Sequence, residues 1–184
     1  MSKRALRLGG VVLALSLLLA GCAGTAQPTQ QSVDDRDLVQ SSHAAVDALL
    51  THVRGTLDPG KPILTASFVS IDQLTESSSL GRMMAEQMTT RMTRHGYTVI
   101  EMKLRDAIFI REGMGEFMLS RELQDISRQH DAQAVVVGTY AVGSNTIYVT
   151  ARIVRATDGV ILSSHDYHLP IGPNTRHLLR TQRR

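Results

Sequence analysis

The sequence predicts an α/β fold of the α+β type: a single domain with a mixed sheet of about four or five strands, about three helices and the order α-β-α-β-α-β-β-β. Two features of the chain predict it. Helical apolar periodicity alternates with short β-rich runs over the first part, which is typical of β-α units. Two hairpin signals separate the apolar runs of the last part, which predicts an antiparallel meander. A length of 184 residues is that of one domain.

The first predicted helix precedes the first predicted strand. Asp34 or Asp35 is placed to cap a helix whose apolar residues recur at helical spacing until about Leu57. Residues 63–71 are rich in apolar and β-branched residues and are bounded by a proline and an aspartate. This composition predicts a buried strand.

A methionine-rich helix is predicted next. A serine of the run 77–79 supplies its N-cap, and Gly96 its C-cap. Its methionines are Met83, Met84, Met88 and Met92. A methionine stripe invites a metal-binding or partner-binding interpretation, but methionine commonly fills gaps in a core, and we expect core packing here. Residues 97–102 then form a second strand.

The remaining elements are a short helix or turn over residues 104–110, a glycine-punctuated loop over 111–118, a helix over 120–130 and a central strand over 134–142. Gly143-Ser144-Asn145 and Asp158-Gly159 are hairpin signals. Between them, residues 147–154 alternate in polarity, which predicts a strand with one face more buried. Residues 170–184 contain proline, glycine and four arginines, and we expect a loosely ordered basic tail.

Residues 1–21 have the three-part plan of a secretory signal peptide. Lys3, Arg4 and Arg7 precede an apolar run over residues 8–20. The 13 residues of this run are too few for a membrane-spanning helix, which needs about 20. A retained transmembrane anchor is therefore disfavoured.

A single cysteine follows the apolar run. Leu19-Ala20-Gly21-Cys22 resembles the bacterial lipobox, in which the cysteine thiol is acylated and the chain is cut before it; the alternative is a chance cysteine near an ordinary cleavage site. Two or more acyl chains anchor a protein stably. Because Ala23 rather than aspartate comes next, the resemblance implies the outer membrane. Residues 22–35 then comprise the acylated cysteine and a flexible tether of about 20 Å, and residues 36–169 a domain facing the periplasm.

The mature chain carries little net charge. The whole chain has 20 basic and 17 acidic residues, and loss of three basic residues with the signal leaves 17 of each. Electrostatic binding to nucleic acid therefore has no support, and an aromatic content of 4% without tryptophan disfavours base stacking. Because Cys22 is the only cysteine, the domain has no thiol for a disulfide, a thiolate metal site or a nucleophile.

No set of residues predicts catalysis. The chain lacks a P-loop, a nucleophile elbow and a dinucleotide fingerprint, since Gly113-Met114-Gly115 has no third glycine. His165 and His168 are expected on opposite faces of a strand, so we expect solvated strand-end residues rather than a metal site. No spacing singles out a pair among the carboxylates Glu101, Asp106, Glu112 and Glu116. We therefore expect no enzyme, no cofactor and no metal.

One loop is a candidate partner surface. Its charged and apolar members are Arg111, Glu112, Met114, Glu116, Phe117 and Arg121. Apolar loop residues with charged neighbours suit a partner-binding edge. The alternative is that Phe117 and Met118 fasten the loop to the core.

Six segments between residues 60 and 170 form a family-like pattern: Ser79-Leu80-Gly81-Arg82, Arg91, Gly96-Tyr97, Glu101-Met102-Lys103-Leu104-Arg105, Arg111-Glu112-Gly113-Met114-Gly115-Glu116 and Leu119-Ser120-Arg121. On these segments, residues 60–170 resemble FlgO, a family of outer-membrane lipoproteins associated with the flagellum. The stretch from residues 135–140 through Asp158-Gly159 also resembles TolB-like and CsgG-like periplasmic α/β domains, so it supports the fold more than the function.

The FlgO resemblance implies a structural or assembly component of the flagellar basal body, in or beside the ring next to the outer membrane, needed for motility or flagellar stability. It implies no catalytic residues. The expected partners are the membrane, through acylated Cys22, and flagellar-ring or other envelope proteins, with a homo-oligomer left open and nucleic acid excluded. The alternative is a tethered periplasmic lipoprotein that regulates a cell-envelope synthase or a secretion system, although a tether of about 20 Å is short for crossing the periplasm.

Overall fold

The structure, a computed structural model, describes residues 34–74, 77–102, 109–111, 117–119 and 121–180. Within these residues the helices are α2 (Leu38–Val53), α3 (Ser79–Arg94), α4 (Arg121–Gln129) and α5 (Pro173–Leu179). The strands are β1 (Ile63–Ala66), β2 (Val69–Ser70), β3 (Val99–Met102), β4 (Phe109–Arg111), β5 (Phe117–Leu119), β6 (Ala134–Val142), β7 (Thr146–Arg155) and β8 (Ile161–Pro170). The predicted α/β class with one domain and a mixed sheet is confirmed.

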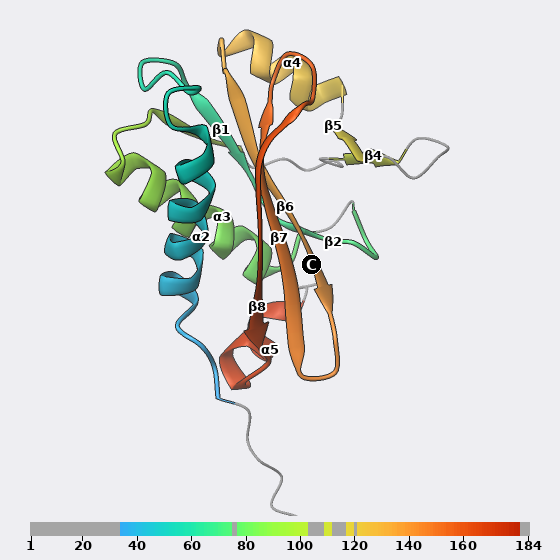
Figure 1. Ribbon diagram of the computed structural model, residues 1–184. Helices are drawn as coiled ribbons and strands as arrows, with labels where there is room; N and C mark the ends of the chain where they lie inside the picture. The colour runs from blue at the N-terminus through green and yellow to red at the C-terminus, as the bar shows by residue number, and fades with distance from the viewer. Residues whose placement is uncertain (1–33, 75–76, 103–108, 112–116, 120, 181–184) are drawn as a thin grey trace, which may run out of the picture. The chain divides into compact units, whose positions relative to one another are not determined.

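The main sheet has the strand order β3-β1-β6-β7-β8, and β2 adds a sixth strand by pairing with β6. β1 runs parallel to β3 and β6, whereas β6, β7 and β8 form the predicted antiparallel meander (Figure 1). The sheet exceeds the predicted four or five strands because residues 63–71 form two strands. Ile63 pairs with Ala134 and Val69 with Thr139, so the first segment contains one residue more than β6 over the same span. Phe68, which lies between the two strands, is fully buried.

Helices cover both faces of the sheet. α2 and α3 pack on one face, where their apolar residues share a core with Val136 of β6. Leu123 of α4 packs on the other face with Val135 and Val137 (Figure 1). Because neighbouring residues of β6 enter different cores, this strand is apolar along most of its length, as strands covered on both faces are.

α3 begins and ends as predicted. Ser78 Oγ accepts a hydrogen bond from the Gly81 N–H at 3.1 Å, and Gly96 has a φ of 87°, the left-handed conformation that ends many helices. Met84, Met88 and Met92 are buried in the core between α3 and the sheet. The core interpretation of the methionine stripe is therefore confirmed.

The cap of α2 differs from the prediction. Asp37 caps this helix, since its carboxylate accepts a hydrogen bond from the Gln40 N–H at 3.0 Å. The prediction that Asp34 or Asp35 caps the helix is wrong, because α2 begins later and Asp35 serves a different helix.

That helix is α5, in the stretch expected to be a loosely ordered tail. The Asp35 carboxylate accepts hydrogen bonds from the Asn174 N–H at 2.8 Å and the Thr175 N–H at 3.0 Å. Burial opposes ionisation of Asp35, but these N–H groups outweigh it and lower the pKa of the carboxyl below its usual value. With Pro173 at the first helical position, where its fixed φ suits a helix, residues 173–179 are helical rather than loosely ordered.

A short hairpin replaces part of the predicted turn and loop. β4 and β5 pair antiparallel, with Phe109 opposite Leu119 and Arg111 opposite Phe117. The prediction of a helix or turn over 104–110 is thus wrong for its last two residues, because the aromatic and β-branched pair Phe109-Ile110 favours a strand. Residues 103–108 and 112–116 lie outside the described residues.

Candidate functional site

Most of the predicted site residues lie outside the described residues or at their margin. Cys22 lies outside, as do three members of the candidate partner surface, Glu112, Met114 and Glu116. Arg111 pairs with Phe117 across the β4–β5 hairpin, and Arg121 is the first residue of α4. The hairpin therefore brings two of the predicted residues together, and partner binding there stays a prediction.

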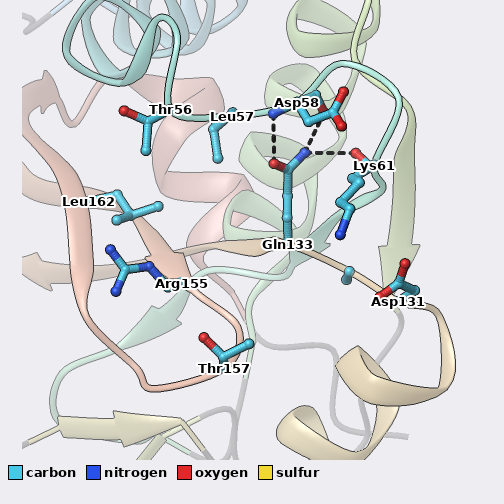
Figure 2. A pocket seen from close by; sticks show the side chains of 10 residues that line it. Thr56, Leu57, Asp58, Lys61, Asp131, Gln133, Arg155, Thr157 and Leu162 are labelled. Carbon is cyan, nitrogen blue, oxygen red and sulfur yellow. Dashed lines mark hydrogen bonds between the residues drawn. The ribbon is translucent and has the colours of Figure 1, made fainter.

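A groove of about 350 Å³ opens where β6 begins and β7 ends (Figure 2). It is lined by Thr56, Leu57, Asp58, Lys61, Asp131, Ala132, Gln133, Arg155, Thr157 and Leu162. The Gln133 side-chain oxygen accepts the Asp58 N–H at 2.8 Å, and its nitrogen donates to the carbonyl oxygens of Asp58 at 2.6 Å and Lys61 at 2.8 Å. Gln133 thus ties residues 58–61 to β6, and this tie occupies both polar atoms of its amide.

An ion pair and an apolar wall border the groove. The Arg155 Nη1 donates to Asp158 Oδ2 at 2.7 Å. The Val160 N–H, with Arg155, lowers the pKa of Asp158 below its ordinary value. Leu57 and Leu162 supply the apolar wall (Figure 2). The pair fixes the β7–β8 turn, so Arg155 has a structural role at the groove.

The groove continues into a second hollow of about 250 Å³, which shares Asp131, Ala132 and Thr157 with it. Within the described part of the chain, Lys61 and Asp131 form no ion pair. None of the described lining hydroxyls is hydrogen-bonded to a histidine or carboxylate, the arrangement that activates a nucleophile. Lys61 and Asp131 thus place groups of opposite charge beside the apolar wall of Leu57 and Leu162.

The two histidines of β8 do not converge. His165 lies opposite Ala151 and His168 opposite Tyr148, so they occupy opposite faces of the strand, as predicted. The His165 ring stacks on Tyr167 with 6.1 Å between centroids. In the residues that the structure describes, no three His, Cys, Asp or Glu side chains are grouped to hold a metal ion. These same residues contain no helix with the length and apolarity to cross a membrane.

An ion cluster that the sequence did not reveal joins α2 to α3. Arg91 donates through Nε and Nη2 to both carboxylate oxygens of Asp47, at 2.8 and 2.7 Å. His95 Nε2 lies 2.7 Å from Asp47 Oδ1. The hydrogen bonds from Arg91 outweigh desolvation and, helped by His95, lower the pKa of Asp47 to about 2. Of these three residues, only Arg91 belongs to the FlgO-like segments. The sequence did not reveal the cluster, because Asp47 lies 44 positions before Arg91 and no local pattern links the two.

A close-packed junction explains another FlgO-like residue, Gly81. A Cβ on Gly81 would lie 2.1 Å from the Phe68 carbonyl oxygen, and one on Gly138 would lie 2.1 Å from Phe68 Cε2. The Phe68 N–H donates to the Gly81 carbonyl at 3.1 Å, and Ser77 Oγ donates to the Phe68 carbonyl at 2.8 Å. Gly81 therefore lets the start of α3 meet the sheet, which is a packing role.

Comparison with solved structures finds one that shares this arrangement and others of lower similarity. The LpoB C-terminal domain from Salmonella enterica matches with a TM-score of 0.53 and 14% identity, covering 72% of this chain and 98% of that domain. The LpoB C-terminal domain from Escherichia coli matches at 0.48 and 14%, covering 74% and 99%. Lipoprotein GNA1162 from Neisseria meningitidis matches at 0.41 and 20%, covering 61% and 82%. At such low identity, the first of these shows the fold alone.

No curated protein sequence matches the chain. The family model described as FlgO protein matches residues 43–174, well over half of the 184 residues. This range begins in α2, runs through the whole main sheet and ends in α5. The chain therefore belongs to the FlgO family.

Proposed function

We propose that this chain is a non-catalytic outer-membrane lipoprotein that serves as a structural or assembly component of the flagellar basal body. Its place is in or beside the ring next to the outer membrane, where it is needed for motility or flagellar stability. Membership of the FlgO family, which implies a flagellum-associated protein, is the observation that carries the proposal.

Anchoring through acylated Cys22 rests on the sequence. The signal-like run and the segment Leu19-Ala20-Gly21-Cys22 have the order that acylation requires, and Ala23 favours the outer membrane. Asp34 follows Cys22 by 12 positions, so a flexible tether keeps the domain within about 20 Å of the bilayer on average. The domain is then placed to act close to the membrane.

A structural role agrees with how the domain uses its charged groups. Asp47 and Arg91 hold two helices together, and Arg155 and Asp158 hold a turn. The groove of Figure 2 offers side chains of both charges and an apolar wall without an activated nucleophile. These features support contact with another protein. The candidate contact residues remain Arg111, Glu112, Met114, Glu116, Phe117 and Arg121, and whether the partner is a second copy of this chain is left open.

Swimming in soft agar by a clean deletion strain tests the proposal. We expect lost or reduced motility, restored by the wild-type gene but not by Cys22→Ser made at the same level. Normal swimming of the deletion strain would contradict the flagellar role and favour the alternative, a tethered regulator of a cell-envelope synthase or secretion system. Restoration by Cys22→Ser would contradict the need for the anchor.

The partner surface has its own test. The double substitution Met114→Ala with Phe117→Ala should lower motility while the protein level stays normal, because it removes the apolar part of the surface. The matched control is Val160→Ala with Ile161→Ala, two exposed apolar residues at another turn, 47% and 54% exposed. Equal motility of the two double variants would remove residues 111–121 from the proposal.

A further inference from the structure

The described part of the chain begins at residue 34, at one end of the domain. Asp35 is bound to the first turn of α5, and the Ile171 N–H donates to the Asn145 carbonyl at 2.8 Å. Residue 34, the start of α2, α5 and the β6–β7 turn therefore lie at one end (Figure 1). We call residues 34–39, 142–148 and 171–180 the tether end.

The opposite end of the domain carries the groove. Gln133, directly before β6, is bonded to Asp58 at 2.8 Å, whereas the tether end lies beyond Val142, where β6 finishes. A strand rises about 3.3 Å per residue, so the two ends of β6, eight positions apart, are separated by about 26 Å. The groove end is therefore well separated from the tether end.

Arginines dominate the free charge of the tether end. Arg36, Arg176 and Arg180 are exposed. Of the acidic residues, Asp35 binds the N–H groups that open α5 and Asp37 those that open α2. The partial positive charge of a helix amino terminus offsets a carboxylate bound there. Within the described residues of this end, Asp34 is then the one carboxylate that is not bound to a helix terminus. Three arginines therefore face one such carboxylate, and the free charge of this end is positive.

The tether end also carries exposed apolar and aromatic side chains. Val39 on the first turn of α2 is 47% exposed, Val142 at the β6–β7 turn is 47% exposed, and Tyr148 is 62% exposed. A Cβ on Gly143 would lie 3.6 Å from Tyr148 Cε2, so the ring lies over the turn. Tyrosine is enriched where protein meets the headgroup layer of a bilayer, since its ring is apolar and its hydroxyl polar.

We infer that the tether end rests on the anionic lipid headgroups of the membrane that holds the anchor. Arg36, Arg176 and Arg180 meet lipid phosphates, and Tyr148 and Val142 enter the headgroup layer. A tether of about 20 Å keeps this end close to the bilayer, which raises its effective concentration there. The inference rests on the proposed anchoring at Cys22, and it turns the groove and the β7–β8 turn away from the membrane.

A fluorescence experiment on the acylated full-length protein tests the orientation. Acylation blocks Cys22, the only cysteine, so an added cysteine is the single free thiol. Asn174→Cys places an environment-sensitive dye on the tether end, and Thr56→Cys places it at the groove end; both positions are exposed. The protein is reconstituted into vesicles of phosphatidylethanolamine and phosphatidylglycerol that contain a headgroup-linked spin-label quencher.

We expect strong quenching at residue 174 and weak quenching at residue 56. Arg176→Glu with Arg180→Glu should weaken quenching at 174, because each arginine near an anionic surface contributes about a fivefold preference. The control Arg54→Glu with Arg94→Glu makes the same charge change on exposed residues at the carboxyl ends of α2 and α3, and should leave quenching unchanged. Circular dichroism confirms that each variant is folded.

Equal quenching at residues 174 and 56 would overturn the inference, since the domain would then tumble freely on its tether. An equal effect of the two charge-reversal pairs would also overturn it, because binding would not depend on the tether end. Failure of the protein to float with the vesicles would instead refute anchoring at Cys22, and with it the inference. Flotation with equal quenching refutes the orientation alone.

Discussion

The contact between Phe68 and Gly138 predicts that one added methyl group is costly and that a second substitution removes the cost. Phe68 is fully buried, and a Cβ on Gly138 would lie 2.1 Å from its ring atom Cε2. The ring has little freedom to withdraw, because the Phe68 backbone is bonded to Gly81 at 3.1 Å and to Ser77 at 2.8 Å. Gly138→Ala therefore displaces either the ring or β6.

Overpacking a core costs about 1–3 kcal/mol, and so short a contact places Gly138→Ala near the upper end, at about 3 kcal/mol. Phe68→Ala leaves a cavity and costs about 3–5 kcal/mol. In the double variant the new methyl occupies space that the ring has vacated, so its cost should equal that of Phe68→Ala alone. The coupling between the two sites is then about 3 kcal/mol.

Urea unfolding of the mature chain carrying Cys22→Ser, followed by circular dichroism, measures the free energies of the cycle. Gly60→Ala is the control, because a Cβ there meets only the Asp58 side chain, at 3.2 Å, and should change the stability by less than about 0.5 kcal/mol. Where Phe68→Ala is too unstable, Phe68→Leu replaces it. If the losses of unfolding free energy of the two single variants simply add in the double variant, the reasoning is refuted, since the added methyl group would not clash with Phe68.

Three further predictions concern the helices. Asp35→Ala should cost about 1 kcal/mol and speed hydrogen exchange in α5, because two N–H groups lose their partner; unchanged exchange in residues 174–179 would contradict the cap. The pKa of Asp47 lies at about 2, below its ordinary 3.8, so its stabilising effect is present above about pH 4 and is lost as the pH falls through 2. The Asp47 side chain is 43% exposed, which limits its stabilising effect to about 1 kcal/mol. Asp47→Asn should therefore reduce the loss of unfolding free energy between pH 5 and pH 2, as measured by urea unfolding at the two pH values. An unchanged loss in the variant would speak against the cluster. Met88→Ala should lower the free energy of unfolding by about 2–5 kcal/mol and Met83→Ala by less, because Met88 is fully buried and Met83 only partly; equal losses would count against the core interpretation.

Periodicity predicted the elements that are determined by local pattern. The methionine stripe of α3 follows helical spacing, and it packs in the core as its apolar character requires. The meander of β6, β7 and β8 follows from two turn signals and an alternating strand. The serine before α3 and Gly96 after it mark the helix ends because caps depend on local conformation.

Long-range contacts account for most of what local pattern missed. Asp35 caps α5 by binding Asn174, which lies 139 positions later in the chain, and nothing near Asp35 in the sequence indicates this. Between β1 and β2, Phe68 packs against Gly81 and Gly138, which lie 13 and 70 positions later in the chain. One local signal for α5 was present in the sequence, because proline is favoured at the first position of a helix and Pro173 stands there.

The candidate site was predictable only in part. Charged and apolar residues in the segment 111–121 predicted a partner-binding surface, and Arg111 and Phe117 of this segment are paired across a hairpin. The groove near Gln133 joins residues 56–61 to residues 131–133 and 155–162, and no sequence pattern links these segments. The tether end likewise could not be predicted from the sequence, because it is defined by the hydrogen bonds between Asp35 and the first turn of α5.

Electron cryotomography of basal bodies in the deletion strain tests the central claim most directly, with complementation by the wild-type gene and by Cys22→Ser. The proposed role predicts that density next to the outer membrane is missing or thinned in the deletion strain, and that only the wild-type protein restores it. An intact ring in the deletion strain would contradict the role as a structural or assembly component of the basal body.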